Sequence, residues 1–504
     1  MVELARSVLK NSFYNGLSVI ISKGGGVVFT VILARLLHPE LFGTYHLALS
    51  VGLMFLTFTD LGINGTVIRY VSHAIGEDDR DSAASYFRYL LKIKFVFSLI
   101  TTLVLVSLAG PLASHLFHKP ELSLPLMIVG LFLFFQSFLD FIESGFVSMQ
   151  RFEYSTIRHL IYEGSRLVIV PLFILLGFSV YGALAGLILS VVLAVIVLAW
   201  FFLRNYSFLL RGKAMKNDRK RKVLRFLGYL TLGSISGIFF AYVDSIMLGM
   251  FMPTEYVGFY RAGYNIVFAF VGLTSIAAVL FPVFAQLERD ELEDAFRKVF
   301  KYTSIIAFPC AFGLIFSAEP LIKSVYGIEY MPAILPTCIL SLLIVITPMD
   351  FFGTLFNAKD KPEYPAKLLI YSSIINIALN YVFILKFGVA GAAAATVISR
   401  YINAICLGLL SKKFLNIFPR LDAIYKPILS SAVMCLFLYL LPAPSTLLAS
   451  AGMVAITSII YLLTLYLVKG IEMEDIRYLS LVLGHEKKLS CLHNLTEGKL
   501  FRKR

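Results

Sequence analysis

Several ionisable side chains of this sequence lie inside long apolar stretches, where a charge needs a partner or a function. Gln136, Asp140 and Glu143 follow one another at spacings of four and three residues, so they share one face of a helix. Asp350 holds the equivalent place in a second, similar stretch. These four residues could bind a coupling proton or cation in a polar cavity. The alternative is a polar stripe that forms hydrogen bonds between helices.

Three positive charges, Lys23, Arg166 and Arg400, also fall within apolar stretches. An arginine can bind a phosphate group through two parallel hydrogen bonds, whereas a lysine offers a point charge. Lys23 and Arg400 could therefore hold the phosphate groups of an anionic substrate. The alternatives are ion pairs, of Arg166 with Glu163 three residues earlier and of Lys23 with Asp60 or another carboxylate.

Four further polar residues complete the candidates. Asp60 and Asn64 are four residues apart and are predicted on one helix face, whereas Arg69 falls on the opposite side and could instead anchor at lipid headgroups. Asp244 is another acid in apolar surroundings. The candidates for a substrate cavity are thus Lys23, Asp60, Asn64, Arg69, Arg166, Asp244 and Arg400. We expect no metal site, because the histidine pair His115 and His118 lacks further ligands.

Membrane-spanning helices must position these residues. The chain has 504 residues, of which 58% are hydrophobic and 15% are charged, against about 25% charged residues in soluble domains. We therefore predict an all-α polytopic membrane protein. Fourteen segments are apolar and long enough to cross a bilayer; they lie near residues 13–34, 43–66, 89–109, 123–149, 159–178, 182–203, 226–251, 259–286, 300–318, 333–357, 365–385, 389–411, 425–441 and 446–468.

The basic residues predict how these helices are oriented. If the N-terminus is cytoplasmic and the segments alternate, 37 of the 45 lysines and arginines lie at inner ends and five at outer ends. Positive charge resists translocation, so this bias favours a protein of the cytoplasmic membrane with both termini in the cytoplasm. The densest group lies in residues 204–225. Basic loops explain the net charge of +14 without a nucleic-acid partner.

The two halves of the chain carry similar motifs at a nearly constant offset. The matching pairs are ELFGTY at 40–45 with EYVGFY at 255–260, SFLDF at 137–141 with TPMDF at 347–351, and VYGA at 180–183 with VAGA at 389–392. An even number of segments separates the copies, so they insert in the same direction as a parallel repeat. We predict two pseudo-symmetric six-helix lobes, 1–203 and 226–411. A cytoplasmic linker at 204–225 joins them, and two C-terminal helices at 425–468 precede a basic cytoplasmic tail at 469–504.

Two stretches resemble a known family. LARLLHPELFGTY at residues 33–45 and DLGINGTVIRY at 60–70 are similar to the polysaccharide-transport flippases of the MOP exporter superfamily, which include O-antigen repeat-unit flippases. DSIMLG at 244–249 and GFY at 258–260 are similar in the second half, although His38 stands where the family pattern has glycine. The resemblance implies a protein that moves a lipid-linked oligosaccharide from the inner to the outer leaflet.

Two other functions stay open on the sequence alone. A multidrug exporter of the same fold would use a cavity with acids and few cations. A glycan polymerase or ligase would need catalytic groups in its outer loops, but these loops are short and contain no carboxylate pair or triad. We expect a flippase rather than an enzyme, without a cofactor unless Na⁺ or H⁺ couples to transport. The expected partners are the lipid-linked oligosaccharide, membrane lipids, and glycosyltransferases or a polymerase of the same pathway; we expect a monomer.

Overall fold

The computed structural model describes residues 2–213, 215, 217–274, 289–359, 361–440 and 447–471. The regular secondary structure in these ranges is helical. The α-helices are α1 (Val2–Asp60), α2 (Ile63–Gly76), α3 (Arg80–Pro111), α4 (Ser123–Ser148), α5 (Glu153–Phe173), α6 (Ser179–Tyr206), α7 (Asn217–Phe251), α8 (Thr254–Thr274), α10 (Arg289–Val325), α11 (Ile334–Val345), α12 (Phe351–Ala358), α13 (Glu363–Phe414), α14 (Asp422–Leu440) and α15 (Leu447–Leu467). Eight stretches of the described chain are long and apolar enough to cross a membrane, as an all-α multi-pass membrane protein requires.

Three of these stretches are far longer than one crossing needs, and each contains a sharp turn. α1 breaks at His38 (φ 58°), just before Pro39, whose fixed φ and missing N–H suit the first position of a new helix. α13 breaks at Gly388 (φ 59°). α5 and α6 are joined through a π-helix, Ile174–Phe178, in which Gly177 is left-handed (φ 92°). Since about 20 residues span a bilayer, each of these stretches has room to cross it twice.

The second predicted segment, 43–66, ends earlier than expected. α1 stops at Asp60, Leu61 and Gly62 have φ values of 42° and 81°, and a separate helix, α2, follows. The backbone N–H of Asn64, in the first turn of α2, donates to Asp60 Oδ1 (3.0 Å) across this turn. The prediction that Asp60 and Asn64 share a face of one helix is therefore wrong, because the glycine allows a left-handed turn between them.

The predicted segment 333–357 is also interrupted. It consists of α11, a 3₁₀ turn at Thr347–Asp350 and α12. Pro348 lies in that turn, and proline cannot donate the N–H that a continuous α-helix needs. The predicted segment 259–286 continues past α8 into residues that the structure does not describe. The same is true of the predicted tail from residue 472 onward.

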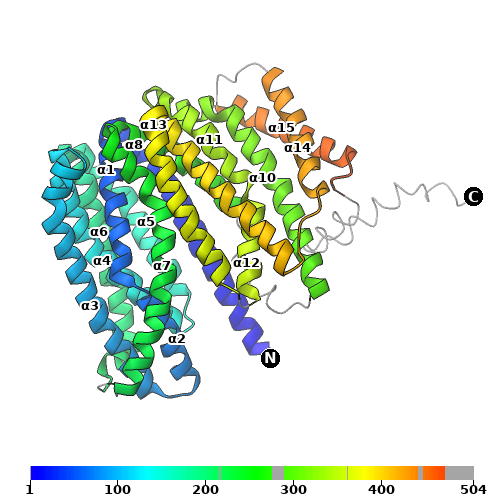
Figure 1. Cartoon of the computed structure of the whole chain (residues 1–504). Helices are drawn as coiled ribbons and strands as arrows, with labels where there is room; N and C mark the ends of the chain where they lie inside the picture. Colours follow the sequence, from blue (N-terminus) through cyan, green and yellow to red (C-terminus); the bar gives the residue numbers. More distant parts are fainter. Residues whose placement is uncertain are drawn as a thin grey trace, which may run out of the picture.

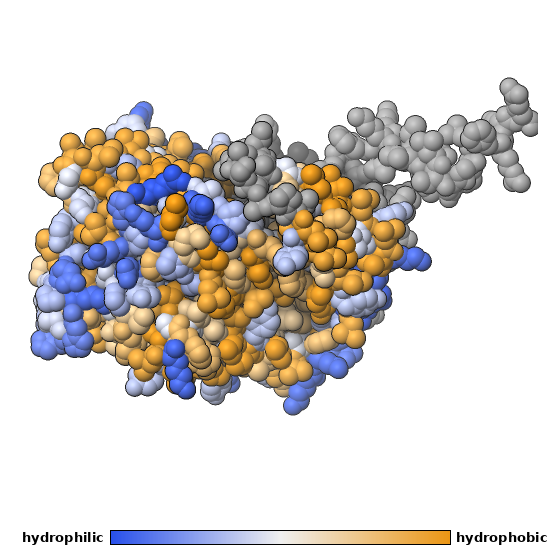
Figure 2. All heavy atoms as spheres, turned by 90° about the horizontal axis from the view of Figure 1, so that it is seen from above, coloured by the Kyte–Doolittle hydropathy of each residue, from blue (hydrophilic) through white to orange (hydrophobic). Residues whose placement is uncertain are grey.

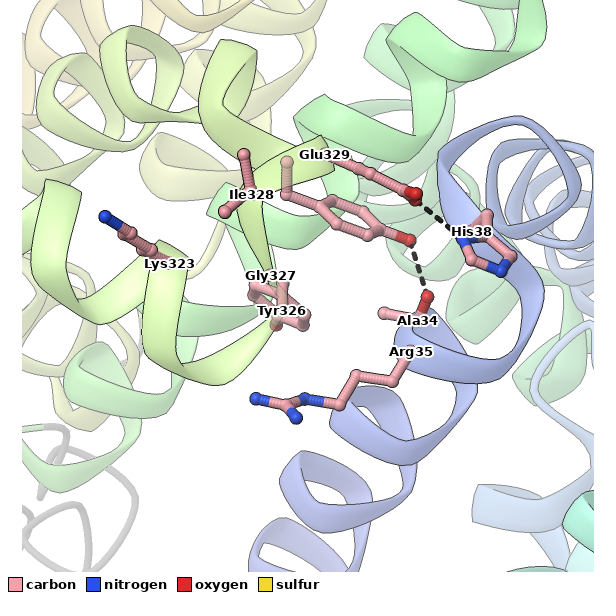
Figure 3. A pocket seen from close by; sticks show the side chains of 9 residues that line it. Ala34, Arg35, His38, Lys323, Tyr326, Gly327, Ile328 and Glu329 are labelled. Atoms are coloured by element: carbon pink, nitrogen blue, oxygen red, sulfur yellow. Dashed lines mark hydrogen bonds and ion pairs between the residues drawn. The ribbon is translucent and has the colours of Figure 1, made fainter.

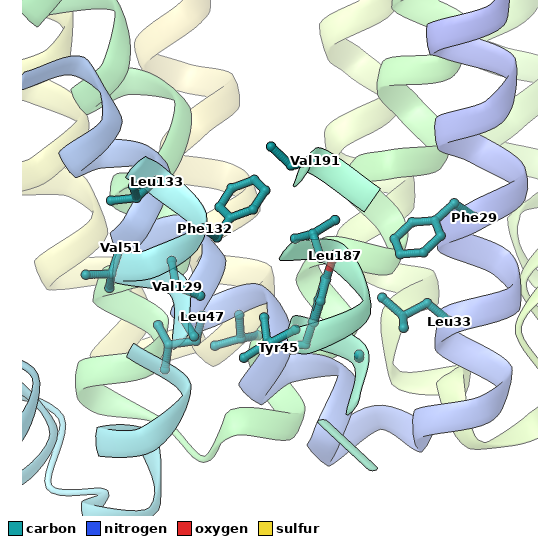
Figure 4. Packing of buried hydrophobic residues seen from close by; sticks show 14 of the residues in the cluster. Phe29, Leu33, Tyr45, Leu47, Val51, Val129, Phe132, Leu133, Leu187 and Val191 are labelled. Carbon is teal, nitrogen blue, oxygen red and sulfur yellow. The ribbon is translucent and has the colours of Figure 1, made fainter. Parts of the chain in front are cut away.

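α1 is the element around which the others are arranged. It packs against α3, α4, α5, α6, α7 and α8. In Figure 1 the helices from α2 to α6 lie on one side and those from α10 to α15 on the other, with α14 packed on α10 at the far edge. Figure 4 shows part of the buried core where α1 meets α4 and α6; its labelled side chains are Phe29, Leu33, Tyr45, Leu47, Val51, Val129, Phe132, Leu133, Leu187 and Val191.

The outer surface of the molecule is largely apolar. Figure 2, which looks down on the molecule of Figure 1 from above, shows mostly hydrophobic residues with the hydrophilic ones in separate patches. Large aliphatic side chains such as Leu175 (73% exposed) and Leu467 (77% exposed) point away from the core. Such a surface is expected of helices that face lipid.

Candidate functional site

A cavity of about 640 Å³ lies between α1, α4, α5, α6 and α8. Apolar and aromatic side chains form much of its wall. Its lysine, arginine, histidine, glutamate and amide side chains are Lys23, His46, Gln136, Arg158, His159, Glu163, Arg166 and Asn265. Lys23, Gln136 and Arg166 are candidates from the sequence, and the structure brings them to one cavity.

Contacts on two sides hold Arg166 against the wall of the cavity. Its Nη2 lies 2.5 Å from Glu163 Oε2, so the predicted local ion pair is present. The guanidinium also lies over the rings of Phe29 (4.4 Å) and Tyr162 (5.0 Å). The ion pair and the two rings thus fix the guanidinium of Arg166 in the wall of the cavity, with its Nε buried and without a hydrogen-bond partner in the described ranges.

Lys23 is on the first part of α1 and has an exposed side chain at the same cavity. It forms no ion pair with any residue in the described ranges. Asp60, its predicted partner, pairs instead with Lys94 (3.3 Å), whose side chain is 1% exposed. Lys23 is thus a cavity cation whose charge is not balanced by a carboxylate of the described chain.

Arg158 connects the cavity to the polar face of α4. It pairs with Asp140 (2.5 Å) and with Glu143, and Gln136 donates to Asp140 (2.9 Å). The polar face of α4 that the sequence predicts is therefore present, and an arginine of α5 covers it. Because Arg158 sits between two carboxylates, its positive charge is more than balanced.

The spacing of residues in α5 could have identified Arg158. The predicted segment begins at residue 159, whereas α5 begins earlier, so Arg158 lies inside the helix and not at its end. Arg158, Tyr162 and Arg166 are four residues apart, which places them on one face, and all three line the cavity.

Asp244 lies in a separate buried cluster formed by α7, α8 and α13. It is 2% exposed. Its Oδ1 accepts from Asn380 (2.6 Å) and its Oδ2 from the hydroxyl groups of Tyr260 and Thr396 (both 2.7 Å). The Oδ1 of Asn380 has no hydrogen-bond partner within the described part of the chain. Carboxylate, amide and hydroxyl oxygens so close together could hold a proton or a small hard cation.

The other candidates do not line the cavity. Asn64 and Arg69 are on α2, where Arg69 is exposed and lies over an aromatic ring of α7 (4.4 Å). Asp350 is in the 3₁₀ turn between α11 and α12. Arg400, on α13, acts electrostatically on Asp350 and on Tyr264. These residues therefore do not contribute to the wall of the cavity.

The cavity is closed toward the end of the molecule where α1 breaks, which we call the His38 end. There α1 and α8 cross so closely that a Cβ at Gly43 would overlap the Thr254 carbonyl, and one at Gly258 would overlap the Pro39 carbonyl. Thr254 and Gly258 correspond to Pro39 and Gly43 when the first pair of motifs is aligned. Equivalent positions of the two motifs thus make this crossing.

Polar contacts hold the His38 end together (Figure 3). His38 Nδ1 lies 2.6 Å from Glu329 Oε2, and the Tyr330 hydroxyl donates to the Ala34 carbonyl (3.0 Å). Arg35 donates to the last carbonyl groups of α10, with its Nε 2.7 Å from the final one. A cation at the carbonyl end of a helix is favourable because that end carries partial negative charge.

Lys119 forms a matching contact from the loop between α3 and α4. Its Nζ donates to the carbonyls of Gly249 (2.5 Å) and Met252 (2.8 Å) at the end of α7. Burial lowers the pKa of Lys119. In the same alignment of the two halves, Gly249 corresponds to Ala34, whose carbonyl accepts the hydrogen bond from the Tyr330 hydroxyl. Two equivalent helix ends are therefore each capped by a side chain from a distant loop.

Comparisons with known proteins agree on the class of this protein. Residues 8–288 match the family described as "Polysaccharide biosynthesis protein". The Haloferax volcanii protein named "Probable low-salt glycan biosynthesis flippase Agl15" is 25% identical over 259 residues, which are 50% of this chain; the chain spans about half of that relative, 53% of its length. The Shigella flexneri protein named "Putative O-antigen transporter" is 22% identical over 433 residues, 82% of this chain and 99% of that protein. The structure of lipid II flippase MurJ in an inward closed conformation shares the fold, with a TM-score of 0.74, 16% identity and coverage of 94% of this chain and 100% of that one.

Proposed function

This chain belongs to the polysaccharide biosynthesis protein family, and we propose that it is a flippase of the MOP exporter superfamily for a polyprenyl-(pyro)phosphate-linked oligosaccharide. It would move this lipid from the inner to the outer leaflet of the cytoplasmic membrane for cell-surface polysaccharide or glycoprotein biosynthesis. The observation that carries the proposal is the cavity with Lys23 and Arg166 in its wall.

The cavity has the chemistry that a phosphate headgroup needs in a membrane. A diphosphate that leaves water loses its hydration, so fixed donors and positive charge must replace part of it. Lys23 supplies a charge that no carboxylate of the described residues balances, and Arg166 supplies a guanidinium in the cavity wall. A volume of about 640 Å³ suits a headgroup rather than a whole polyprenyl lipid. The lipid tail would stay among the acyl chains outside the cavity.

The proposed architecture is fourteen membrane-spanning helices in two six-helix lobes, with α14 and α15 as an addition. The lobes would rock about the cavity and open it to one side of the membrane at a time. The distribution of basic residues supports a His38 end that faces outward. The close α1–α8 crossing then supports a state that is closed to the outside.

An ion could supply the energy for this movement. We propose that Na⁺ or H⁺ binds either the α4 face around Asp140, where the carboxylates are half-buried, or the cluster around Asp244, where the carboxylate is buried among polar groups. Asp350 would contribute to ion binding at the Asp244 cluster, because it interacts electrostatically with Arg400 on α13, a helix of that cluster. Glycosyltransferases or a polymerase of the same pathway would be partners of the monomer.

The multidrug-exporter alternative is the weaker one. A cavity for cationic drugs would be acidic, whereas in this cavity Glu163 is paired with Arg166, and Lys23 has no carboxylate partner among the described residues. The family match is also to polysaccharide biosynthesis proteins. A polymerase or ligase activity has no support in these comparisons, whose named relatives are a flippase and a transporter.

A reconstituted flipping assay tests the proposal. Proteoliposomes would contain a fluorescent polyprenyl-diphosphate oligosaccharide, and a membrane-impermeant quencher would report the fraction that changes leaflet. We expect Lys23→Gln and Arg166→Gln to lower the initial rate at least ~10-fold, because each removes a charged hydrogen-bond donor. Arg204→Gln, at an exposed position near the end of α6, controls for loss of charge and should flip at the wild-type rate. Wild-type rates in both cavity variants would exclude the cavity as the phosphate route.

A further inference from the structure

We propose a second anion-binding subsite at the closed end of the cavity, formed by His46, Arg261 and Asn265. It would take a phosphate group of the substrate after that group leaves Lys23 and Arg166. The inference rests on the function proposed above and adds a site to it. Arg261 itself is not among the residues that line the cavity.

Arg261 is a buried arginine without a carboxylate partner in the described parts of the chain. It is 7% exposed. Its Nη2 donates to Ser50 Oγ (2.9 Å), and its guanidinium lies 5.6 Å and 5.2 Å from the ring centres of Tyr242 and Tyr264. Its Nε has no hydrogen-bond partner among these residues. A buried charge normally has an opposite charge beside it, so a mobile anion is the simplest partner for this one.

Two further nitrogen atoms beside Arg261 lack partners. His46 Nε2 and Asn265 Nδ2 are buried and form no hydrogen bond within the described ranges. Both residues line the cavity. His46 is one helical turn before Ser50, which Arg261 contacts, and Asn265 is one turn after Arg261. Three buried nitrogen atoms that the described chain leaves unpaired therefore belong to residues at or within one helical turn of the Arg261–Ser50 contact, where α1 faces α8.

The repeat explains why polar residues face each other here. When the two halves are aligned on their first motif, Arg261 corresponds to His46 and Asn265 corresponds to Ser50, just as Gly258 corresponds to Gly43. The crossing that closes the His38 end thus continues into a row of equivalent polar positions. If the only role of the α1–α8 contact were to close the His38 end, apolar side chains would be favoured there, because a buried hydrogen-bond donor without a partner is costly.

The chemistry of these groups selects a phosphate. Arginine and the amide nitrogen donate only, and the imidazole Nε2 donates in one tautomer or when protonated. A phosphate group offers several acceptor oxygens and negative charge, and arginine binds it through two parallel hydrogen bonds. A neutral sugar offers no charge to balance Arg261. The subsite therefore fits the phosphate of the lipid carrier rather than the glycan.

Binding measurements on the full chain in lipid nanodiscs test this inference. Isothermal titration would use two probes, farnesyl diphosphate and inorganic pyrophosphate. We expect Arg261→Gln to weaken binding of both probes by about 10- to 100-fold, the range for a lost charge-assisted hydrogen bond. Arg261→Lys should recover part of the affinity, and Asn265→Ala should lose about 3- to 10-fold as a neutral donor. Arg204→Gln should bind like the wild type.

The outcomes separate this subsite from the function itself. If Arg166→Gln weakens binding but Arg261→Gln and Asn265→Ala do not, the second subsite is wrong and the flippase proposal stands. If Arg166→Gln, Arg261→Gln and Asn265→Ala all bind both probes like the wild type, the cavity is not a phosphate site, and both proposals are wrong. A loss confined to farnesyl diphosphate would mean that Arg261 senses the lipid chain, which also overturns the subsite. Should Arg261→Gln fold poorly, Asn265→Ala alone decides, because Asn265 lines the cavity and its buried amide nitrogen has no hydrogen bond that the substitution would break in the described chain.

Discussion

Arg158 is the residue on which two carboxylates of α4 depend. It pairs with Asp140 and Glu143, and all three side chains are half-buried. We expect Arg158→Met to destabilise the protein by about 2–3 kcal/mol, because it removes a charge-assisted hydrogen bond from each of two half-buried carboxylates. A thermal-shift or denaturant titration in detergent would measure the change. Arg151→Met is the matched control, since Arg151 is 46% exposed and its pair with Glu153 is at the surface; it should cost less than about 1 kcal/mol.

Equal stability of the two variants would contradict that account. It would mean that Asp140 and Glu143 are protonated in the membrane and need no cation. In that case the α4 face would be a better proton-coupling site than a structural one. The comparison therefore bears on both of the alternatives that the sequence leaves open for this face.

The position and the partner of a single charged residue are hard to predict from the sequence. Hydropathy identifies Lys23 and Arg166 because both lie deep within apolar stretches. It places Arg158 and Arg261 at the ends of segments, since limits drawn from hydropathy exclude polar turns that belong to the helix. Which carboxylate meets which cation is a tertiary property. Lys94, far from Asp60 along the chain, pairs with it in place of Lys23.

At the scale of helices, the crossing of α1 and α8 depends on two glycines. A side chain at Gly43 would meet the backbone of α8, which cannot yield as a side chain can. We expect Gly43→Ala to separate the helices and shift the protein away from the closed His38 end. Spin labels at Leu41 and Ile328, both exposed, should report longer distances in this variant than in the wild type. Gly164→Ala, where no atom lies within 4 Å of the new Cβ, is the control and should leave the distances unchanged.

An unchanged distance distribution in Gly43→Ala would show that the crossing is not what keeps this end closed. The polar contacts of Arg35, His38 and Lys119 would then be sufficient. A gain in distance in both glycine variants would instead indicate general loosening of the bundle.

The helices are largely predictable because apolar length and basic ends define them. The breaks inside them are not. Asp60 and Asn64 have the spacing of one helix face, yet Gly62 adopts a left-handed conformation between them. Pro348 interrupts the predicted segment 333–357. A glycine or proline in an apolar stretch allows a break but does not require one, so tertiary packing decides.

At the scale of the whole molecule, transport by alternating access requires that the His38 end opens and closes. His38 and Glu329 meet across this end, from parts of the chain that are predicted to lie in different lobes. In a variant without native cysteines, His38→Cys and Glu329→Cys could be joined by a short, reducible bifunctional thiol reagent. We expect cross-linking to reduce flipping to the background rate and reduction to restore it, because a protein fixed in this state cannot release substrate outward.

A second cysteine pair separates this effect from chemical damage. Ser114→Cys with His118→Cys joins two residues of a single loop, whose contact in the structure is local. Cross-linking that pair should leave the flipping rate unchanged. If the His38–Glu329 cross-link also leaves the rate unchanged, the two lobes need not separate at this end. The phosphate would then have to cross by a path that does not pass the α1–α8 crossing, and the row of polar groups from His46 to Asn265 would lose its role in transport.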